Sequence, residues 1–139
     1  RVGADMALDP SDPHALQQVL ELTGGKGVDR SFEAVGNSAA LKTALSVTRK
    51  GGSVTLIGNL NPSVDLPLQS VVTREISLLG SCAIAGEYPL ALELLSRRLV
   101  DPASVLSATA PLADGPQWFD RLYRREKGLL KVVLHPGEV

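Results

Sequence analysis

The side chains that could support acid–base or metal chemistry are few and lie far apart in the sequence. His14 falls in the first turn of an expected helix and His135 lies near the C-terminus, so we interpret both as surface histidines. Cys82 has no second ligand at metal spacing, and we expect a small buried apolar residue rather than a zinc ligand. Glu33 lies inside an apolar segment, where burial requires a hydrogen-bond donor. We predict a structural hydrogen bond for Glu33 rather than a catalytic role.

A different kind of site is indicated by three apolar segments that each end in a glycine. Gly36, Gly58 and Gly80 close the segments 28–36, 53–58 and 76–80. In an open parallel sheet, ligands bind just outside the carboxyl ends of the strands. Glycine lacks the Cβ that would hold a flat ligand away from the backbone, but it also permits the tight turns that every α/β protein needs. The sequence leaves both interpretations open, and three such ends in succession slightly favour a ligand.

Short apolar segments alternate with helical patterns, as in right-handed βαβ crossovers. This alternation predicts an α/β fold with a parallel sheet whose strands are covered by helices on both faces. Asp12 and Asn37 are typical N-caps, and Trp118 with Phe119 is expected to belong to the core. The expected strands are 6–8, 28–36, 53–58, 76–81, 105–110 and 131–134; the expected helices are 13–23, 38–50, 90–99 and 116–123, with 68–74 as a short helix or turn and Gly51-Gly52 ending the second helix.

Composition argues against several classes of function. The chain has 139 residues, a net charge of −1 and 4% aromatic residues, so neither charge nor base stacking favours a nucleic-acid partner. No apolar run approaches the roughly 20 residues of a membrane span. One cysteine cannot form an internal disulfide, which predicts a cytoplasmic location. No Ser-His-Asp order, paired carboxylates or G-x-G-x-x-G loop after an expected strand can be assembled.

Several motifs, in consistent order along the chain, resemble those of the zinc-dependent medium-chain alcohol dehydrogenases. The similarity is greatest to the polyol branch, which comprises the sorbitol (L-iditol) 2-dehydrogenases and threonine dehydrogenase-like enzymes. The motifs are Gly3-Ala4-Asp5, Gly27-Val28-Asp29, Phe32-Glu33-Ala34-Val35-Gly36-Asn37, Gly51-Gly52-Ser53-Val54-Thr55-Leu56-Ile57-Gly58 and Gly128-Leu129-Leu130-Lys131-Val132-Val133-Leu134.

The resemblance implies that the chain is the C-terminal part of such an enzyme. Residues 1–104 would form the later part of a dinucleotide-binding domain, a partial doubly wound, Rossmann-type sheet that lacks its first strands. Residues 105–139 would form a return segment towards the catalytic domain. The zinc ligands, the glycine-rich loop and the acidic residue for the ribose would precede Arg1. No catalytic or metal-binding residue is therefore expected within the chain.

The same resemblance implies contacts with NAD, with NADP left open. The segment Ala34, Val35, Gly36 and Asn37 would border the adenosine side of the cofactor, and Ile57, Gly58 and Asn59 would lie beside the nicotinamide and its ribose. Ser81 and Ala83 match backbone positions that hold the carboxamide. Lys131 matches a basic position near the pyrophosphate or the nicotinamide ribose.

The implied reaction of the complete enzyme is hydride transfer between a secondary alcohol or polyol and the nicotinamide, with zinc polarising the alcohol oxygen. The chain alone is expected to be inactive, and the complete enzyme is expected to be a homo-oligomer with neither nucleic acid nor membrane as partner. Two alternatives stay open. One is a zinc-free medium-chain reductase of the quinone reductase type, and the other is a non-catalytic truncated module.

Overall fold

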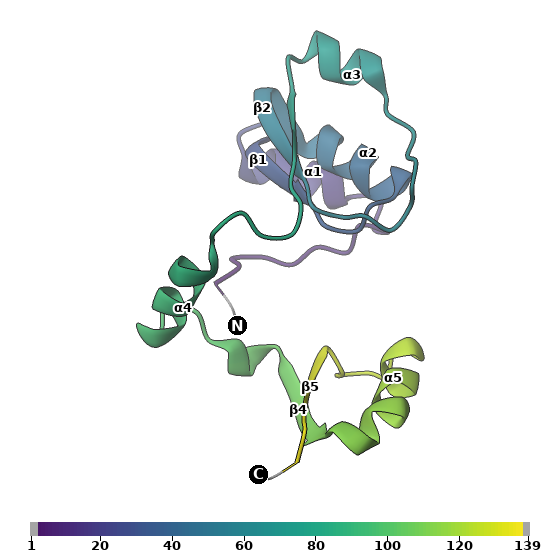
Figure 1. The fold of residues 1–139 in the computed structure, drawn as a ribbon. Coiled ribbons are helices and arrows are strands. Elements are labelled where there is room, and N and C mark those ends of the chain that lie inside the picture. Colours follow the sequence, from purple (N-terminus) through teal and green to yellow (C-terminus); the bar gives the residue numbers. More distant parts are fainter. Residues whose placement is uncertain (1–2, 138–139) are drawn as a thin grey trace. The chain divides into compact units, whose positions relative to one another are not determined.

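The computed structural model describes residues 3–137 and divides the chain into two compact units (Figure 1). One unit is Met6–Ala83, and the other combines residues 84–137 with residues 3–5. Both units contain parallel strands connected through helices, so the expected α/β fold with open parallel sheets is confirmed. The assignment of residues 1–104 to one domain and 105–139 to a return segment stays a prediction.

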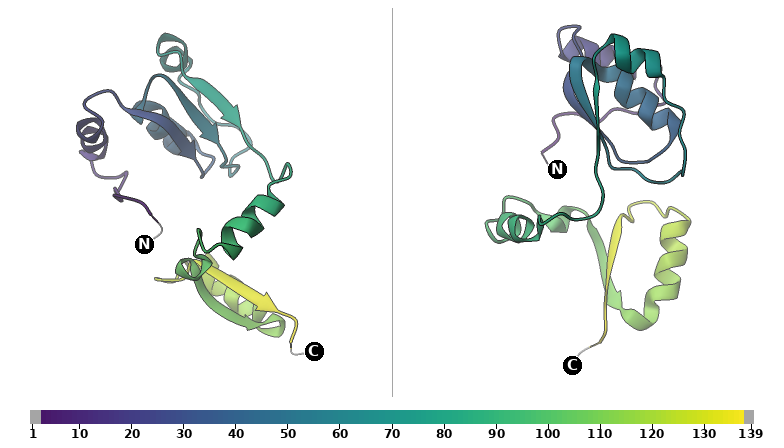
Figure 2. Two further views of the ribbon diagram at one scale, coloured as in Figure 1. Left: turned by 90° about the vertical axis from the view of Figure 1, so that its left-hand side faces the viewer. Right: turned by 45° about the horizontal axis from the view of Figure 1, so that its top comes forward.

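The unit Met6–Ala83 is built on a three-stranded parallel sheet in the order β1-β2-β3. Two views of the ribbon show the strands side by side, with α2 on one face of the sheet (Figure 2). Each strand is followed along the chain by a helix, because a parallel neighbour can be reached only by a crossover. The elements are α1 (Ala15–Leu22), β1 (Val28–Glu33), α2 (Ser38–Val47), β2 (Thr48–Leu56), α3 (Leu68–Thr73) and β3 (Ser77–Gly80).

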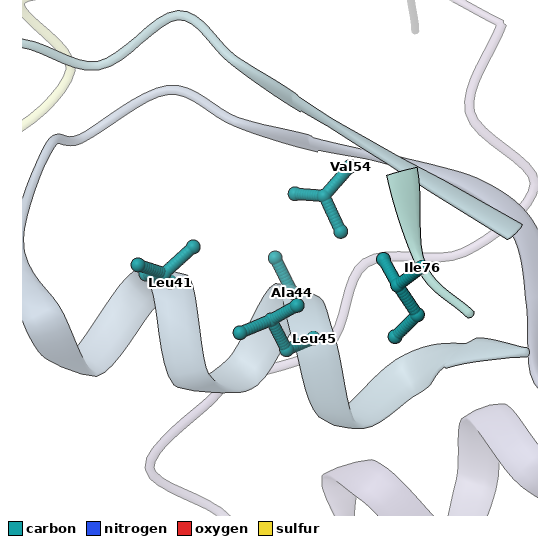
Figure 3. Close-up of a cluster of buried hydrophobic side chains, with 5 residues drawn as sticks. All are labelled: Leu41, Ala44, Leu45, Val54 and Ile76. Atoms are coloured by element: carbon teal, nitrogen blue, oxygen red, sulfur yellow. The ribbon is translucent and has the colours of Figure 1, made fainter. Parts of the chain in front are cut away.

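The core of this unit lies between α2 and the sheet (Figure 3). Leu41 and Leu45 recur at helical spacing and are 3% and 2% exposed, so that one face of α2 is turned to the strands. Val54, near the end of the middle strand, is fully buried against them. Asn37 begins the helix, because its Oδ1 accepts a hydrogen bond from the Ala40 amide at 2.8 Å, as predicted.

Two polar residues hold the C-terminal end of α2 against the sheet. The buried Thr48 hydroxyl donates to the Ala44 carbonyl at 2.7 Å and shares a hydrogen bond with Ser31 Oγ at 2.8 Å. The Arg74 guanidinium donates to the carbonyls of Leu45 (2.9 Å) and Thr48. Carbonyls in the last turn of a helix have no partner within the helix, so a cation from a distant segment satisfies them here.

The other unit contains a two-stranded parallel sheet with a helix in its crossover. Trp118 is half-buried, and the Arg121 guanidinium lies 4.0 Å from the centroid of its ring, a cation–π distance. Its elements are α4 (Tyr88–Ser96), the 3₁₀ turns η1 (Pro102–Ser104) and η2 (Leu112–Asp114), β4 (Leu106–Pro111), α5 (Gly115–Tyr123) and β5 (Lys131–His135).

The predicted strand at residues 6–8 is wrong. The segment has no partner strand, and Leu8 instead lines a hollow of about 380 Å³ together with Leu16, Val19 and Val47. Leu8 thus shares this hollow with side chains of α1 and α2 and does not pair in the sheet. The predicted Asp12 cap is close to the observed arrangement, because Asp12 Oδ1 accepts a hydrogen bond from the His14 amide at 2.8 Å although the helix is assigned from Ala15.

Three further predictions are corrected. Cys82 is exposed rather than buried, because it follows the last residue of β3, beyond the reach of α2. Phe119 is 71% exposed, since a two-stranded sheet offers only enough surface to cover the neighbouring face of α5. Gly51 and Gly52 lie inside β2 and do not end α2, which stops earlier at Val47. Within residues 3–137, no helix has the length and apolar character needed to cross a membrane.

The core predicts a clear difference between two leucines. Leu45→Ala removes a side chain that is 2% exposed and should lower the free energy of unfolding by about 2–5 kcal/mol. Leu60→Ala, at a side chain that is 69% exposed, is the matched control and should change it by less than about 0.5 kcal/mol. Urea denaturation followed by circular dichroism measures both values. Equal losses would contradict the assignment of the core.

Candidate functional site

The three glycine-ended strand ends meet at one edge of the sheet. Glu33 pairs in register with Leu56, and Leu56 pairs with Gly80. Beyond these pairs, the Ile57 and Gly58 amides donate to the Glu33 carbonyl at 2.8 and 3.0 Å, and the Ser81 amide donates to the Leu56 carbonyl at 3.0 Å. The three strand ends therefore lie side by side. We call this part of the unit, residues 33–37, 56–61 and 80–83, the carboxyl edge.

The Glu33 side chain holds the turn that follows β1. It is 4% exposed, and its Oε1 accepts hydrogen bonds from the Val35 and Gly36 amides, both at 2.8 Å. A buried carboxylate that accepts backbone N–H groups is stabilised by charge-assisted hydrogen bonds. The predicted structural hydrogen bond is therefore confirmed. Its donors are the amides two and three residues further along the chain.

The backbones of Gly36 and Gly58 touch each other, so that neither position has room for a Cβ. A Cβ on Gly36 would lie 2.5 Å from the Asn59 nitrogen and 2.6 Å from the Gly58 carbonyl carbon. A Cβ on Gly58 would collide with the backbone of Val35 and Gly36. Gly36 also has a φ of +84°, which disfavours other residues. At these two positions the close approach of the two chain segments decides the question that the sequence left open.

Gly80 differs from the other two strand-end glycines. A Cβ built on Gly80 would meet no atom within 4 Å, so the space beside this residue is open. Its φ lies outside the left-handed region, so the backbone does not require glycine either. Of the three glycines, only Gly80 leaves room for a ligand at the position of the missing side chain.

The segment that leaves β2 is tied across the start of α2. The Asn61 amide donates to the Gly36 carbonyl at 3.0 Å, and the Asp65 amide donates to Ser38 Oγ at 2.9 Å. Beneath this segment lies a cavity of about 80 Å³, which is lined in part by Glu33 and Asn37. Pockets for small molecules measure roughly 300–1,000 Å³, so this cavity is too small for a nucleotide. A cofactor would have to lie on the outer side of the carboxyl edge.

That outer side presents both apolar side chains and open backbone. Val35 is 50% exposed and Ile57 is 49% exposed, which places one apolar side chain on each of the first two strand ends. The other positions expected to contact the cofactor are also on this edge: Ala34, Asn59, Ser81 and Ala83 are exposed, while Asn37 and Gly58 are partly buried and Gly36 is buried. The structure therefore brings nine of the ten expected residues onto one edge, and their contact with a cofactor stays a prediction.

Lys131 is the tenth expected residue and belongs to the other unit. It is exposed and opens β5, where it pairs in register with Leu106. Its expected place beside the cofactor stays a prediction.

The residues present do not form a zinc site. In the described range 3–137, no group of three or more His, Cys, Asp or Glu side chains could hold a metal ion. His14 and His135 are exposed, as expected of surface histidines. No step of the chemistry is therefore assigned to a metal bound by these residues.

A larger hollow of about 710 Å³ lies at the opposite, amino end of the sheet, lined by residues that include Arg30, Ser53 and Ser77. Beside it, Arg49 Nε donates to Asp29 Oδ1 at 2.5 Å, and this hydrogen bond lowers the pKa of the Asp29 carboxyl. Both side chains are well exposed, so the pair is screened by solvent. Size alone does not make this hollow the binding site, because ligands of open parallel sheets bind at the carboxyl ends.

Some residues that shape the edge carry no signal in the sequence. Ser38 and Asn61 act through contacts with partners 27 and 25 residues away, namely Asp65 and Gly36. Their roles depend on where the chain returns after β2, which no local pattern reveals. By contrast, the capping contact of Asn37 and the hydrogen bonds of Glu33 join residues two or three positions apart, so the sequence predicted both.

Comparison with known proteins identifies the class to which this fold and edge belong. The family described as "Zinc-binding dehydrogenase" matches residues 1–97, which is more than half of the chain. The chain therefore belongs to the zinc-binding dehydrogenase family, as the sequence motifs led us to expect.

Individual relatives agree with this family. Sorbitol dehydrogenase from Bacillus subtilis (strain 168) is 28% identical over 139 residues, which cover 99% of this chain and 39% of that protein. L-idonate 5-dehydrogenase (NAD(P)(+)) from Escherichia coli (strain K12) is 31% identical over 114 residues, which cover 81% of this chain and 32% of that protein. The solved structure of alcohol dehydrogenase TADH from Thermus sp. ATN1 matches with a TM-score of 0.84 at 29% identity, over 95% of this chain and 38% of that one. The chain thus spans less than half the length of each.

The surroundings of Gly58 and Gly80 predict that substitution by alanine destabilises the fold at the first position and not at the second. Gly58→Ala forces a Cβ against the backbone of residues 35 and 36 and should lower the free energy of unfolding by about 1–3 kcal/mol. Gly80→Ala, the matched control, meets open space and should change it by less than about 0.5 kcal/mol. Thermal unfolding of the two variants measures the difference. A harmless Gly58→Ala would show that the two segments do not touch.

Proposed function

We propose that the carboxyl edge binds the nicotinamide cofactor of an alcohol or polyol dehydrogenase. The single observation that carries this proposal is the alignment of three strand ends at one edge of a parallel sheet, in a chain of the zinc-binding dehydrogenase family. Ligands of open α/β sheets bind at this position. The cofactor class is supported by the relative described as acting with NAD(P)+.

Within this proposal, the segments of the edge have separate roles. Residues 34–37 border the adenosine side, and residues 57–59 lie beside the nicotinamide and its ribose. Val35 and Ile57 support the division, since each exposes about half of an apolar side chain on a different strand end. Ser81 and Ala83 hold the carboxamide through their backbone, and Lys131 contributes a positive charge near the pyrophosphate or the nicotinamide ribose.

The chain's own residues bind and orient the cofactor rather than carry out the reaction. When bound, the cofactor supplies a nicotinamide ring that exchanges a hydride with a secondary alcohol. The packed backbones at Gly36 and Gly58 support the orienting role, because a rigid surface presents one face of a flat ring more reproducibly than a mobile loop does. We infer that zinc ligands come from outside the described residues and that the chain alone has no dehydrogenase activity.

The proposed substrate is a small secondary alcohol or polyol. Relatives named sorbitol dehydrogenase and L-idonate 5-dehydrogenase support this class, since both names denote hydroxylated carbon chains. We further propose that residues 1–104 belong to the cofactor domain, that residues 105–139 return to a catalytic domain, and that the complete enzyme is a cytoplasmic homo-oligomer.

Titration of the 139-residue chain with NAD+, followed by amide NMR, tests the cofactor proposal. We expect shifts at Val35, Ile57 and Ser81, with a Kd on the order of 1 mM or weaker because only part of the cofactor is contacted. Gly24 and Gly25, which lie away from this edge, serve as internal controls. Shifts confined to Arg30, Ser53 and Ser77, or none at all, would overturn the proposal.

Association of the chain is tested separately. Phe32 and Leu79 share one face of the sheet and are 65% and 50% exposed, and exposed apolar surface promotes pairing between copies. We expect the sedimentation coefficient of the chain to rise with concentration, and to rise less for a Phe32→Ser, Leu79→Ser double variant. A monomer of 14.7 kDa at all concentrations would contradict self-association.

A further inference from the structure

One residue at the carboxyl edge accepts four backbone N–H groups. The carbonyl oxygen of Glu33 accepts from Ile57 (2.8 Å) and Gly58 (3.0 Å), which follow β2. The side-chain Oε1 of the same residue accepts from Val35 and Gly36, both at 2.8 Å, which follow β1. The main chain of Glu33 thus holds one segment of the edge, while its side chain holds the other.

The two segments are also in direct contact. The backbones of Gly36 and Gly58 leave no room for a Cβ between them, and the Asn61 amide donates to the Gly36 carbonyl at 3.0 Å. Movement of residues 35–36 therefore changes the position of residues 57–61. Since packed segments transmit small displacements instead of absorbing them, the geometry of the second segment depends on the Glu33 side chain.

We propose that Glu33 is a positioning residue that sets the spacing between residues 34–37 and residues 57–59. This inference rests on the proposed function, in which these segments contact opposite ends of one dinucleotide. Glu33 itself is 4% exposed and acts through the amides it holds, so it need not touch the cofactor. The affinity for a ligand that spans both segments depends strongly on the distance between them, whereas the stability of the fold depends on it less.

The length and the acceptor atom of the side chain both matter to this role. Both side-chain hydrogen bonds end on Oε1, so glutamine keeps an acceptor oxygen at the same distance from the backbone. Aspartate is one methylene shorter and cannot place its oxygen at the same point while the main chain stays paired with β2. The two substitutions therefore separate the loss of position from the loss of charge.

The test measures NAD+ affinity and amide hydrogen exchange for Glu33→Asp and Glu33→Gln in the 139-residue chain. Glu33→Asp should weaken NAD+ binding roughly tenfold, because the shorter side chain no longer holds residues 35 and 36 at the distance from residues 57–59 that a bound dinucleotide requires. It should also speed amide exchange at Val35, Gly36 and Gly58. Glu33→Gln should keep the NAD+ affinity within about threefold of the wild type, since the acceptor oxygen is retained.

Ile76→Val serves as the stability control. Ile76 is 6% exposed in the core, directly before β3 and away from the carboxyl edge, and this substitution destabilises the fold by removing one buried methyl group. It should leave NAD+ affinity unchanged once the folded fraction is corrected for. Equal weakening by Ile76→Val and Glu33→Asp would overturn the inference, as would wild-type affinity in Glu33→Asp.

Failure of the proposed function gives a different result. If the wild-type chain shows no shifts with NAD+, the cofactor proposal fails, and exchange at Gly58 still decides whether the Glu33 side chain couples the two segments. Faster exchange at Val35 and Gly36 but not at Gly58 in Glu33→Asp would show that the coupling is absent.

Discussion

The contact between the backbones of Gly36 and Gly58 is the constraint on which the carboxyl edge depends. Two chain segments can approach this closely only where neither carries a Cβ. The Glu33 carboxylate accepts hydrogen bonds from the part-buried Val35 amide and the buried Gly36 amide in this turn. The contact between the glycines and the burial of the Glu33 carboxylate therefore belong together. The turn that brings Gly36 against Gly58 also directs two amides to that carboxylate.

The rest of the unit keeps the two segments at this distance. Leu41 and Leu45 press α2 onto Val54, and the buried Thr48 and the Arg74 guanidinium hold the end of the helix to the sheet. Parallel pairing of β1 with β2 then carries the register from the core to the edge, from Ser31 opposite Val54 to Glu33 opposite Leu56. The packed core thus fixes the strand ends that form the carboxyl edge, the position at which open parallel sheets bind ligands.

Local chemistry predicted the helices and central strands well, and three of the four errors share one cause. Asn37 caps α2 through an amide three residues away, so its neighbours alone reveal its role. Residues 6–8, Cys82 and Phe119 were misjudged because burial depends on which surface a segment meets. Leu8 lies beside α1 and α2 instead of a partner strand. Cys82 follows the end of β3 and is exposed, and Phe119 is on the exposed side of α5. Periodicity reports which residues share a face, but it does not report how much surface is available to cover that face.

The sequence by itself determined the family and, from residue 15 onward, the order of strands and helices, because these follow from short-range patterns and shared motifs. Only the tertiary structure decided what the glycines that close three of the apolar segments do. Gly36 and Gly58 lie where two backbones touch, while Gly80 borders open space, although all three close an apolar segment of the sequence in the same way. The reason is physical: a missing Cβ is the same in every glycine, and its meaning depends on what occupies the space where the Cβ would be. That space is filled or left open by segments more than twenty residues away in the chain.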